Sequence, residues 1–509
     1  PMPAPVLLDG HSLTLDRVWA VAVDRAPVSL APGARARVEH ARAIVDGVVQ
    51  RREVAYGVTT GFGKLSEIAI PYERLGELQV NLVRSHAAGV GDSLPEREAR
   101  AMMLLRANVI AKGYSGARAT LVDLLSGMLN AGLYPPIPEQ GSVGASGDLA
   151  PLAHLALSLI GEGELLQGTS RGNAAEMLAA AGLAPAVLEP KEGLCLINGT
   201  QAHTAVAALA LVDAYRLWRA AHVAGAMSLE GLLGTPVAFD PRIQEVRGQE
   251  GQAASAALLR ALLADSEIRE SHRDNDPRVQ DAYSLRCMPQ VHGPALDALR
   301  FAESLVGREL NAATDNPLVF EGGEMLSGGN FHGQAVAMAL DVMAIALTNL
   351  ATIAERRIDR LVHPDFNQGL PPFLTRDAGV SSGFMMAQVT AAALASECKT
   401  LSHPASVDTI PTDGNKEDVV PMAMGAAWKT RRIVRNVQHV LAIELMCAAQ
   451  ALDGRAPLAA GAGAEAGRQA VRTLVAPLER DRVLHDDITT LAAAVARGVF
   501  EPEALGVST

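Results

Sequence analysis

Residues 421–452 read PMAMGAAWKTRRIVRNVQHVLAIELMCAAQAL, and the run stops at Gly454. Its apolar side chains recur at spacings of three and four residues, which places them on one face of an α-helix. The residues that mark this face are Val434, Val437, Leu441 and Leu445. Similar runs occupy 334–361 and 382–401, each ending shortly before a proline. The sequence therefore predicts a mostly α-helical protein whose C-terminal half is a bundle of long helices.

The rest of the chain is expected to be organised around these helices. We expect an N-terminal domain over 1–205, a central long-helix bundle over 206–480 and a C-terminal helical tail over 481–509. Alternation typical of β-strands is short. It occurs around Leu7, Val54 and Leu318. Strands are therefore expected to contribute little to the fold.

The composition argues against several classes of protein. The 509 residues include 44 basic and 56 acidic side chains, for a formal net charge of -12. No basic run stands out, which argues against a nucleic-acid-binding surface. The four cysteines lie far apart and the thirteen histidines are scattered. This pattern predicts neither a disulfide framework nor a metal site.

The chain is expected to be cytoplasmic and without a membrane span. No basic segment followed by a long apolar one opens the sequence, so we expect no signal peptide. The apolar helical run over 335–350 is interrupted by Asp341, Thr348 and Asn349. A membrane span requires about 20 consecutive, mainly apolar residues.

Residues 141–151, GSVGASGDLAP, are the stretch most informative about chemistry. One interpretation is structural, a glycine-rich turn that leads into a helix over 148–160. A phosphate-binding loop is a second interpretation, but its Lys-Ser/Thr ending is missing and we expect no strand before the loop. A third interpretation is chemical, because alanine, serine and glycine are adjacent at Ala145, Ser146 and Gly147.

In a tight bend, the Gly147 amide nitrogen can attack the carbonyl carbon of Ala145. Glycine suits this attack because it tolerates unusual backbone conformations and adds no bulk near the nucleophile. Ring closure expels one water, and Ser146 can lose a second across its Cα–Cβ bond because it carries a β-hydroxyl. The product is a 4-methylidene-imidazole-5-one, an electrophile that needs no metal or external cofactor. A helix N-terminus after the loop would add positive potential beside it.

Residues 141–154 closely resemble the signature of the aromatic amino-acid ammonia-lyases, the family of the histidine, phenylalanine and tyrosine enzymes. The resemblance extends from Leu8 to about Val495. Its further blocks are 56–63 (YGVTTGFG), 81–86 (NLVRSH), 197–201 (INGTQ), 279–286 (VQDAYSLR), 314–317 (TDNP), 329–332 (GNFH) and 416–418 (KED). The resemblance implies the long-helix fold of the fumarase- and aspartase-like superfamily, a homotetramer, and the methylidene-imidazolone prosthetic group.

The resemblance also implies roles for residues outside the loop. Tyr56 would take the β-proton of the substrate, which requires a lowered pKa or assisted transfer because tyrosine ordinarily titrates near about 10. Arg286 would hold the substrate carboxylate through two parallel charge-assisted hydrogen bonds. Asn316 would hold the same carboxylate.

Other residues would surround the prosthetic group and orient the amine. They are Tyr283, Asn198 and Gln280, and for each of them an ordinary buried hydrogen bond is the alternative. Asp148 would assist ring formation, although a helix N-cap accounts for it nearly as well. By resemblance, Tyr56 and Tyr283 are expected to come from different subunits than the electrophile.

Two positions bear on the side chain of the substrate. The pair Ser85-His86 resembles the pair of the histidine enzymes, whereas Phe-Leu or His-Leu is typical of the phenylalanine and tyrosine enzymes. Glu417 stands where the histidine enzymes have a glutamate. An imidazole needs one donor and one acceptor, and a His/Glu pair can supply both. With Phe331 as a further substrate contact, the resemblance implies elimination of ammonia from L-histidine to give trans-urocanate.

Two departures from the family pattern leave other outcomes open. After Asp418 the chain has Val-Val-Pro at 419–421 where His-Val-Ser is usual, and after His332 it has Gly333-Gln334 where Ala-Glu-Pro is usual. Both departures are expected close to the substrate pocket. Bacterial tyrosine aminomutases also carry the Ser-His pair. The alternatives are therefore a tyrosine or phenylalanine ammonia-lyase, or a 2,3-aminomutase.

Classes outside the family fit the residues less well. A helical scaffold protein that had lost activity would show a damaged Ala-Ser-Gly triad, and here the triad is complete. A fumarase-like or argininosuccinate-lyase-like enzyme would carry a Gly-Ser-Ser-x-Met-Pro loop, which this sequence lacks. A metal-dependent hydrolase would need clustered ligands. The sequence therefore favours an enzyme that acts on a small amino acid.

The substitution Ser146→Ala is expected to abolish the prosthetic group and most of the activity, because alanine has no β-hydroxyl to lose. The intact mass of the wild-type chain should fall short of its sequence mass by two water molecules. Its near-ultraviolet absorbance should be sensitive to borohydride. The variant should show neither signature, and a variant with unchanged absorbance and full turnover would refute the cyclised electrophile.

Overall fold

The computed structural model describes residues 3–507, which form two compact units, each assembled from three segments of the chain. Unit 1 contains the residues up to Leu209 together with Glu303–Asp341 and Pro404–Trp428. Unit 2 contains Ala210–Ala302, Val342–His403 and the residues from Lys429 onward. Both units are mostly helical, which confirms the predicted fold class. The expected domain boundaries at 205 and 480 stay a prediction.

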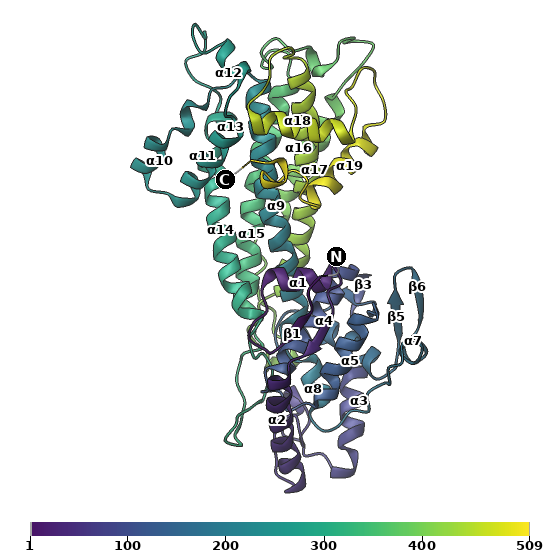
Figure 1. The fold of residues 1–509 in the computed structure, drawn as a ribbon. Helices are drawn as coiled ribbons and strands as arrows, with labels where there is room; N and C mark the ends of the chain where they lie inside the picture. Colours follow the sequence, from purple (N-terminus) through teal and green to yellow (C-terminus); the bar gives the residue numbers. More distant parts are fainter. Residues whose placement is uncertain (1–2, 508–509) are drawn as a thin grey trace. The chain divides into compact units, whose positions relative to one another are not determined.

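Unit 1 combines short helices with four small two-stranded sheets (Figure 1). Its helices include α1 (Leu15–Ala22), α2 (Pro32–Gln50), α3 (Leu75–His86), α4 (Glu96–Ala111), α5 (Ala119–Asn130), α6 (Leu149–Leu159), α7 (Ala174–Ala180) and α8 (Glu192–Ile197). Its strands are β1 (Val6–Leu8), β2 (Val28–Leu30), β3 (Val90–Ser93), β4 (Pro138–Gln140), β5 (Glu164–Gln167), β6 (Ser170–Asn173), β7 (Leu318–Val319) and β8 (Met325–Leu326). The β1–β2 pair is parallel, with Val6 opposite Val28, and the other three pairs are antiparallel.

Four long helices have residues in both units. They are α9 (Gln201–Gly231), α14 (Met288–Glu309), α15 (Gln334–Val362) and α17 (Ala423–Asp453). The remaining helices of unit 2 are α10 (Pro241–Arg247), α11 (Glu250–Leu262), α12 (Glu267–Ser271), α13 (Tyr283–Arg286), α16 (Met385–Leu401), α18 (Ala462–Leu474) and α19 (Leu484–Ala496). The three long helices predicted from periodicity correspond to α15, α16 and α17.

Close helix packing forms the core of unit 2. The predicted apolar face of α17 is buried, with Val434, Val437, Leu441 and Leu445 at most 2% exposed. Gly231 of α9 lies so close to Ala451 of α17 that an added Cβ would approach the alanine Cβ to 2.9 Å. A buried ion pair between Arg357 of α15 and Glu444 of α17 joins two more helix faces, and Ser228 of α9 donates to the same carboxylate at 2.8 Å. These contacts confirm the bundle.

Helix α4 is the central helix of unit 1, because all of its residues from Glu98 to Ala111 are buried. It contacts α1, α2 and α5. It begins at Glu96, and Pro95 occupies its N-cap position. Two of its arginines, Arg100 and Arg106, are buried. Their guanidinium groups donate to backbone carbonyls, and Arg100 donates to the Leu129 and Val21 oxygens at 3.1 and 2.8 Å.

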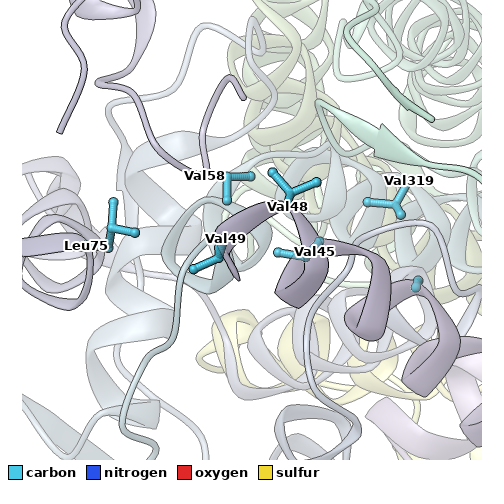
Figure 2. Close-up of a cluster of buried hydrophobic side chains, with 7 residues drawn as sticks. Val45, Val48, Val49, Val58, Leu75 and Val319 are labelled. Atoms are coloured by element: carbon cyan, nitrogen blue, oxygen red, sulfur yellow. The ribbon is translucent and has the colours of Figure 1, made fainter. Parts of the chain in front are cut away.

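A small apolar cluster attaches the segment around Tyr56 to helix α2 (Figure 2). The cluster consists of Ala41, Val45, Val48, Val49, Val58, Leu75 and Val319. Val58 lies two residues after Tyr56 and is fully buried, and Leu75 begins α3, the helix that ends at His86. Burial of these side chains therefore fixes the start of two segments that carry predicted site residues.

Two local expectations are wrong. Within the described residues 3–507, no strand forms around Val54, which is 79% exposed in an irregular segment. A single alternating stretch with no apolar partner gains too little burial to form a sheet. A strand does precede the glycine-rich loop, because β4 pairs with β3, although none was expected.

One helix in the described part of the chain, α15, is long and apolar enough to cross a bilayer. However, 72% of its most apolar window is buried in the protein. The core of the bundle therefore accounts for its apolar composition.

Replacing Val45 by alanine is expected to lower the free energy of unfolding by about 2 kcal/mol, because two methyl groups leave a packed site. The matched substitution Val54→Ala removes the same atoms from an exposed side chain and should change stability by less than about 0.5 kcal/mol. Denaturant midpoints measured on both variants give the comparison. Equal effects would show that the cluster does not support this part of unit 1.

Candidate active site

The Ala145-Ser146-Gly147 segment lies in a tight loop between β4 and α6. The φ angles of Ser146 and Gly147 are +49° and +70°. A left-handed conformation costs a serine roughly 1 kcal/mol, whereas glycine adopts it freely. A Cβ on Gly147 would lie 2.0 Å from the carbonyl oxygen of Gly199, so only glycine fits. The loop therefore has the bend and the bare backbone that the chemical interpretation requires.

Asp148 connects this loop to the N-terminus of α9. One carboxylate oxygen accepts from the backbone N–H groups of Ala202 and His203 at 2.9 and 3.0 Å. The other accepts from the Ser142 hydroxyl at 2.7 Å. The backbone N–H of Asp148 donates to Gly199 at 2.7 Å. Asp148 stands at the N-cap position of α6, but its side chain caps α9 instead.

Asp148 is completely buried. The Nδ1 atom of His203 lies 2.8 Å from Oδ2 of Asp148, the oxygen that also accepts from the α9 backbone. Burial by itself raises the pKa of Asp148, but the charge of His203 and the hydrogen bonds from His203 and Ser142 hold it below its ordinary value. The carboxylate is therefore ionised at neutral pH.

Arg106 of α4 holds the segment that precedes α9. Its guanidinium donates to the backbone oxygens of Cys195 and Asn198 at 2.5 and 3.0 Å, and also to the Gln201 side chain. Burial lowers the pKa of Arg106 to about 10, so it remains charged. Gln201 in turn donates to the Thr314 hydroxyl at 2.9 Å. These bonds fix the backbone of Asn198 and Gly199 against the loop.

A cavity of about 620 Å³ opens beside Ser146 within unit 1. Six of the predicted site residues line it: Tyr56, Ser85, His86, Ser146, Asn198 and Glu417. Its apolar lining includes Phe62, Leu65, Ile68, Ile70, Leu78, Leu82, Leu149, Leu194 and Ile197. A mostly apolar cavity of this size with a few polar groups is typical of a small-molecule site.

Tyr56 accepts a 3.4 Å hydrogen bond from the Gly63 backbone N–H. Burial raises the pKa of its phenol, and the carboxylates of Asp413 and Glu417 raise it further against the effect of Gly63. The lowered pKa that a general base requires is therefore not produced by this chain alone. Tyr56 and Ser146 nevertheless line one cavity of one chain, so the expectation that they come from different subunits is wrong.

His86 ends α3, and its Nδ1 lies 2.9 Å from the Leu82 carbonyl oxygen and 3.0 Å from the Ser85 hydroxyl. A carbonyl oxygen only accepts, so Nδ1 carries the proton and Nε2 of the neutral ring is an acceptor. Burial lowers the pKa of His86, although the Leu82 carbonyl and the carboxylates of Asp413 and Glu417 oppose the shift. His86 therefore offers an acceptor at neutral pH.

Glu417 approaches the loop directly. Its Oε1 accepts from the Ser146 hydroxyl at 2.7 Å, and its Oε2 accepts from the Thr412 hydroxyl at 2.6 Å. Asp413 lines the same cavity and was missed from the sequence. It accepts from the Lys64 backbone N–H at 3.2 Å and so holds the segment that follows Tyr56. Its only signal was its place in a turn four residues before Glu417.

Two of the predicted substrate-binding residues, Asn316 and Phe331, lie in unit 1 but do not line the cavity. Asn316 is adjacent to it, since its carbonyl oxygen accepts from the Asn198 amide at 3.2 Å and its side-chain oxygen accepts from Gly328 N–H at 2.9 Å. Phe331 is half-buried in the turn before α15. Neither lines the cavity of a single chain, so their binding roles stay predictions.

Three predicted residues, Gln280, Tyr283 and Arg286, belong to unit 2. Arg286 donates from Nε to the Asp281 backbone oxygen at 2.9 Å, and its guanidinium lies 4.7 Å from the centroid of the Tyr283 ring. Tyr283 is 71% exposed. These three side chains do not line the cavity beside Ser146. Among the described residues 3–507, no group of three or more His, Cys, Asp or Glu side chains could hold a metal ion.

The chain is similar to known proteins over most of its length. Residues 13–473 match the family model for aromatic amino acid lyases. The chain is 56% identical to a histidine ammonia-lyase of Anaeromyxobacter sp. (strain K), over 97% of this chain and 99% of that protein. It is 53% identical to a histidine ammonia-lyase of Koribacter versatilis (strain Ellin345), over 96% and 98%.

Two solved structures are similar over nearly their whole length. A histidine ammonia-lyase from Trypanosoma cruzi matches with a TM-score of 0.90 at 42% identity, covering 98% of this chain and 95% of that one. A tyrosine aminomutase from Streptomyces globisporus matches with a TM-score of 0.93 at 40% identity, covering 98% of both chains.

The pKa of His86 is expected to lie below the ordinary value of 6.5, because burial disfavours the charged ring. Nuclear magnetic resonance titration of Cε1-labelled histidine measures it, and His86→Gln assigns the signal. Glu417→Gln should lower the pKa of His86 further, because it removes a negative charge that favours the imidazolium. A higher pKa in that variant would contradict the described electrostatics.

Proposed function

Because the chain belongs to the aromatic amino acid lyase family, we propose that it eliminates ammonia from L-histidine to give trans-urocanate. The observation that carries the proposal is the lining of one cavity by Ser146, His86 and Glu417. Relatives at 50–56% identity named histidine ammonia-lyase support the same substrate. The protein is accordingly a carbon–nitrogen lyase.

We further propose that Ala145, Ser146 and Gly147 form the methylidene-imidazolone group used by this family. When present, the group supplies an electrophilic carbon that turns the substrate amine into a better leaving group. The loop fits such a ring, because its left-handed bend brings the bare Gly147 backbone against Gly199. Asn198 lines the cavity with a buried side-chain oxygen that has no hydrogen-bond partner within residues 3–507. That oxygen is available to orient the substrate amine.

Selection of the substrate ring follows from two acceptors. Formation of the ring consumes the Ser146 hydroxyl, and the Oε1 atom of Glu417 thereby loses its present donor. Glu417 Oε1 and His86 Nε2 can then both accept hydrogen bonds, which matches the imidazolium form of the histidine ring, because that form carries two N–H donors and the neutral ring only one. A phenyl ring carries none, and each buried acceptor left unpaired costs about 1–3 kcal/mol. The pair therefore favours histidine over phenylalanine.

Removal of the β-proton is assigned to Tyr56, whose pKa is raised in the single chain. A positive group beside the phenol would lower that pKa. Arg286 is the predicted carboxylate clamp. Its guanidinium lies over the Tyr283 ring, and only its Nε donates a hydrogen bond within residues 3–507. We propose that a second copy of the chain in a homotetramer brings Gln280, Tyr283 and Arg286 to this cavity. Dihedral symmetry is an ordinary route to four copies.

The remaining proposals concern the setting of the enzyme. The substrate is a free amino acid, and the net charge of -12 offers no general attraction for nucleic acid. We propose a cytoplasmic location, which fits four cysteines that are all unpaired.

The decisive experiment is incubation of the purified protein with L-histidine, L-tyrosine and L-phenylalanine. Urocanate, coumarate and cinnamate are distinguished by ultraviolet absorbance. Urocanate should form fastest. Coumarate as the main product would show that the substrate is tyrosine and not histidine. A β-amino acid found by mass spectrometry would identify an aminomutase. The similarity to a tyrosine aminomutase is the reason to test for this product.

Glu417→Gln is expected to lower kcat/KM for L-histidine by about tenfold to a hundredfold, because an amide is a weaker acceptor than a carboxylate by roughly 1.4–3 kcal/mol. Glu77→Gln is the matched control, since Glu77 is an exposed side chain paired with Arg74. The control should keep wild-type kinetics. Wild-type kcat/KM in Glu417→Gln would remove this residue from substrate selection.

A further inference from the structure

His203 and Gly333 both contact the segment of the loop around Gly144 and Asp148, and neither lines the cavity. We propose that His203 is a positioning residue for formation of the prosthetic group. We also propose that position 333 is a glycine because a side chain there would displace the His203 ring. This inference rests on the proposed function, since it presupposes that Ala145, Ser146 and Gly147 cyclise. Neither residue was singled out as a functional residue from the sequence, although Gly333 is one of the two departures from the family pattern.

The first observation is the burial of His203 against Asp148. Both side chains are completely inaccessible, and His203 Nδ1 lies 2.8 Å from the Asp148 carboxylate. The backbone N–H of His203 donates to the same oxygen at 3.0 Å. Neither ring nitrogen has a hydrogen-bond partner of good geometry within the described residues, so the approach of Nδ1 to the carboxylate is a close polar contact. The imidazole is therefore committed to one polar neighbour, which is Asp148.

The second observation is a continuous polar path from His203 to the loop. Asp148 accepts from the Ser142 hydroxyl at 2.7 Å, and Ser142 in turn accepts from the Gly144 backbone N–H at 3.1 Å. Gly144 directly precedes Ala145, whose carbonyl carbon is the point of attack. A shift of the Asp148 carboxylate therefore moves the residue next to the reacting bond.

The third observation is the close fit of His203 to Gly333. A Cβ added to Gly333 would lie 2.6 Å from His203 Cε1 and 2.7 Å from Nε2, so any side chain there displaces the ring. The Gly333 backbone N–H donates to the Gly144 carbonyl at 3.0 Å. Gly333 thus binds the Gly144 carbonyl while it leaves room for the imidazole.

The second departure lies against the same glycine. A Cβ built on Gly144 would lie 3.0 Å from Pro421 Cγ. Neither Gly333 nor Pro421 lines the cavity, so both departures act on the loop rather than on the substrate pocket. Both lie against Gly144, whereas His86 and Glu417, which line the cavity, match the family pattern.

The reaction that His203 supports is a double dehydration without an oxidant. The Gly147 nitrogen bonds to the Ala145 carbon, and the Ala145 oxygen leaves as water with the amide protons of Gly147 and Ser146. The Ser146 hydroxyl then leaves with the Ser146 Cα proton as a second water. His203 touches none of these atoms. Its effect is to keep Asp148 ionised and in place while Asp148 holds the loop.

The test follows cyclisation in freshly synthesised chains by intact mass, as the fraction that lacks two water molecules over time. His203→Leu keeps the volume but loses the polar ring, and should slow cyclisation by about tenfold to a hundredfold, the range seen when a supporting hydrogen-bond partner is removed. His203→Asn keeps a side-chain N–H near the position of Nδ1 and should recover most of the rate. His485→Leu, at an exposed histidine, is the matched control and should cyclise like wild type.

Two further readouts separate positioning from general damage. Loss of His203 should raise the pKa of Asp148, so the acid limb of the cyclisation rate should move to higher pH in His203→Leu. Gly333→Ala should slow cyclisation in the wild-type background, but it should add nothing in the His203→Asn background, because the shorter side chain leaves room for the methyl group.

The outcomes are distinguishable from failure of the proposed function. A wild-type chain that never loses two waters refutes the proposed function itself. A wild-type chain that cyclises while folded His203→Leu, checked by circular dichroism, keeps the same rate and the same acid limb refutes only the role of His203. If His203→Leu does not fold, equal rates and equal pH profiles in wild type and in Gly333→Ala overturn the inference.

Discussion

The capping of α9 by the carboxylate of Asp148 is the interaction on which the candidate site depends. A buried carboxylate is stable only when its charge is met by donors, and here two backbone N–H groups, a serine hydroxyl and an imidazole meet it. The helix N-terminus adds its positive potential. The loop directly precedes Asp148, and α9 is a helix of 31 residues. The Asp148 carboxylate therefore holds the bent loop against the first turn of this long helix.

Charge in the cavity is unbalanced in a single chain. Asp413 and Glu417 both face the space beside Tyr56, and together with burial they favour the neutral phenol. The same carboxylates raise the pKa of His86, but burial lowers it more, so the pKa lies below its ordinary value. Both titratable groups that the proposed chemistry uses are therefore neutral, and the described residues that line the cavity include no lysine or arginine to bind a carboxylate or to activate the phenol.

The long helices and the loop were predictable because their signals are local. Spacing alone identified the buried face of α17, and the adjacent Ala145, Ser146 and Gly147 indicated the chemistry that is proposed. Contacts made across the fold were not predictable. Asp148 caps a helix more than fifty residues away instead of the helix that it precedes, and the turn that places Asp413 in the cavity carries no motif. At Val54 the alternation was real, but no apolar partner was available to bury it.

The bond between Ser146 and Glu417 links the two halves of the proposed chemistry. While the serine hydroxyl is present, it occupies the oxygen that would otherwise accept from an imidazole N–H. Cyclisation removes that hydroxyl as water, so the electrophile and the free acceptor arise in the same event. An uncyclised chain would then lack both catalytic power and part of its selectivity. In the proposed chemistry, the loop that bends Gly147 against Gly199 therefore controls which ring is recognised as well as how its amine is activated.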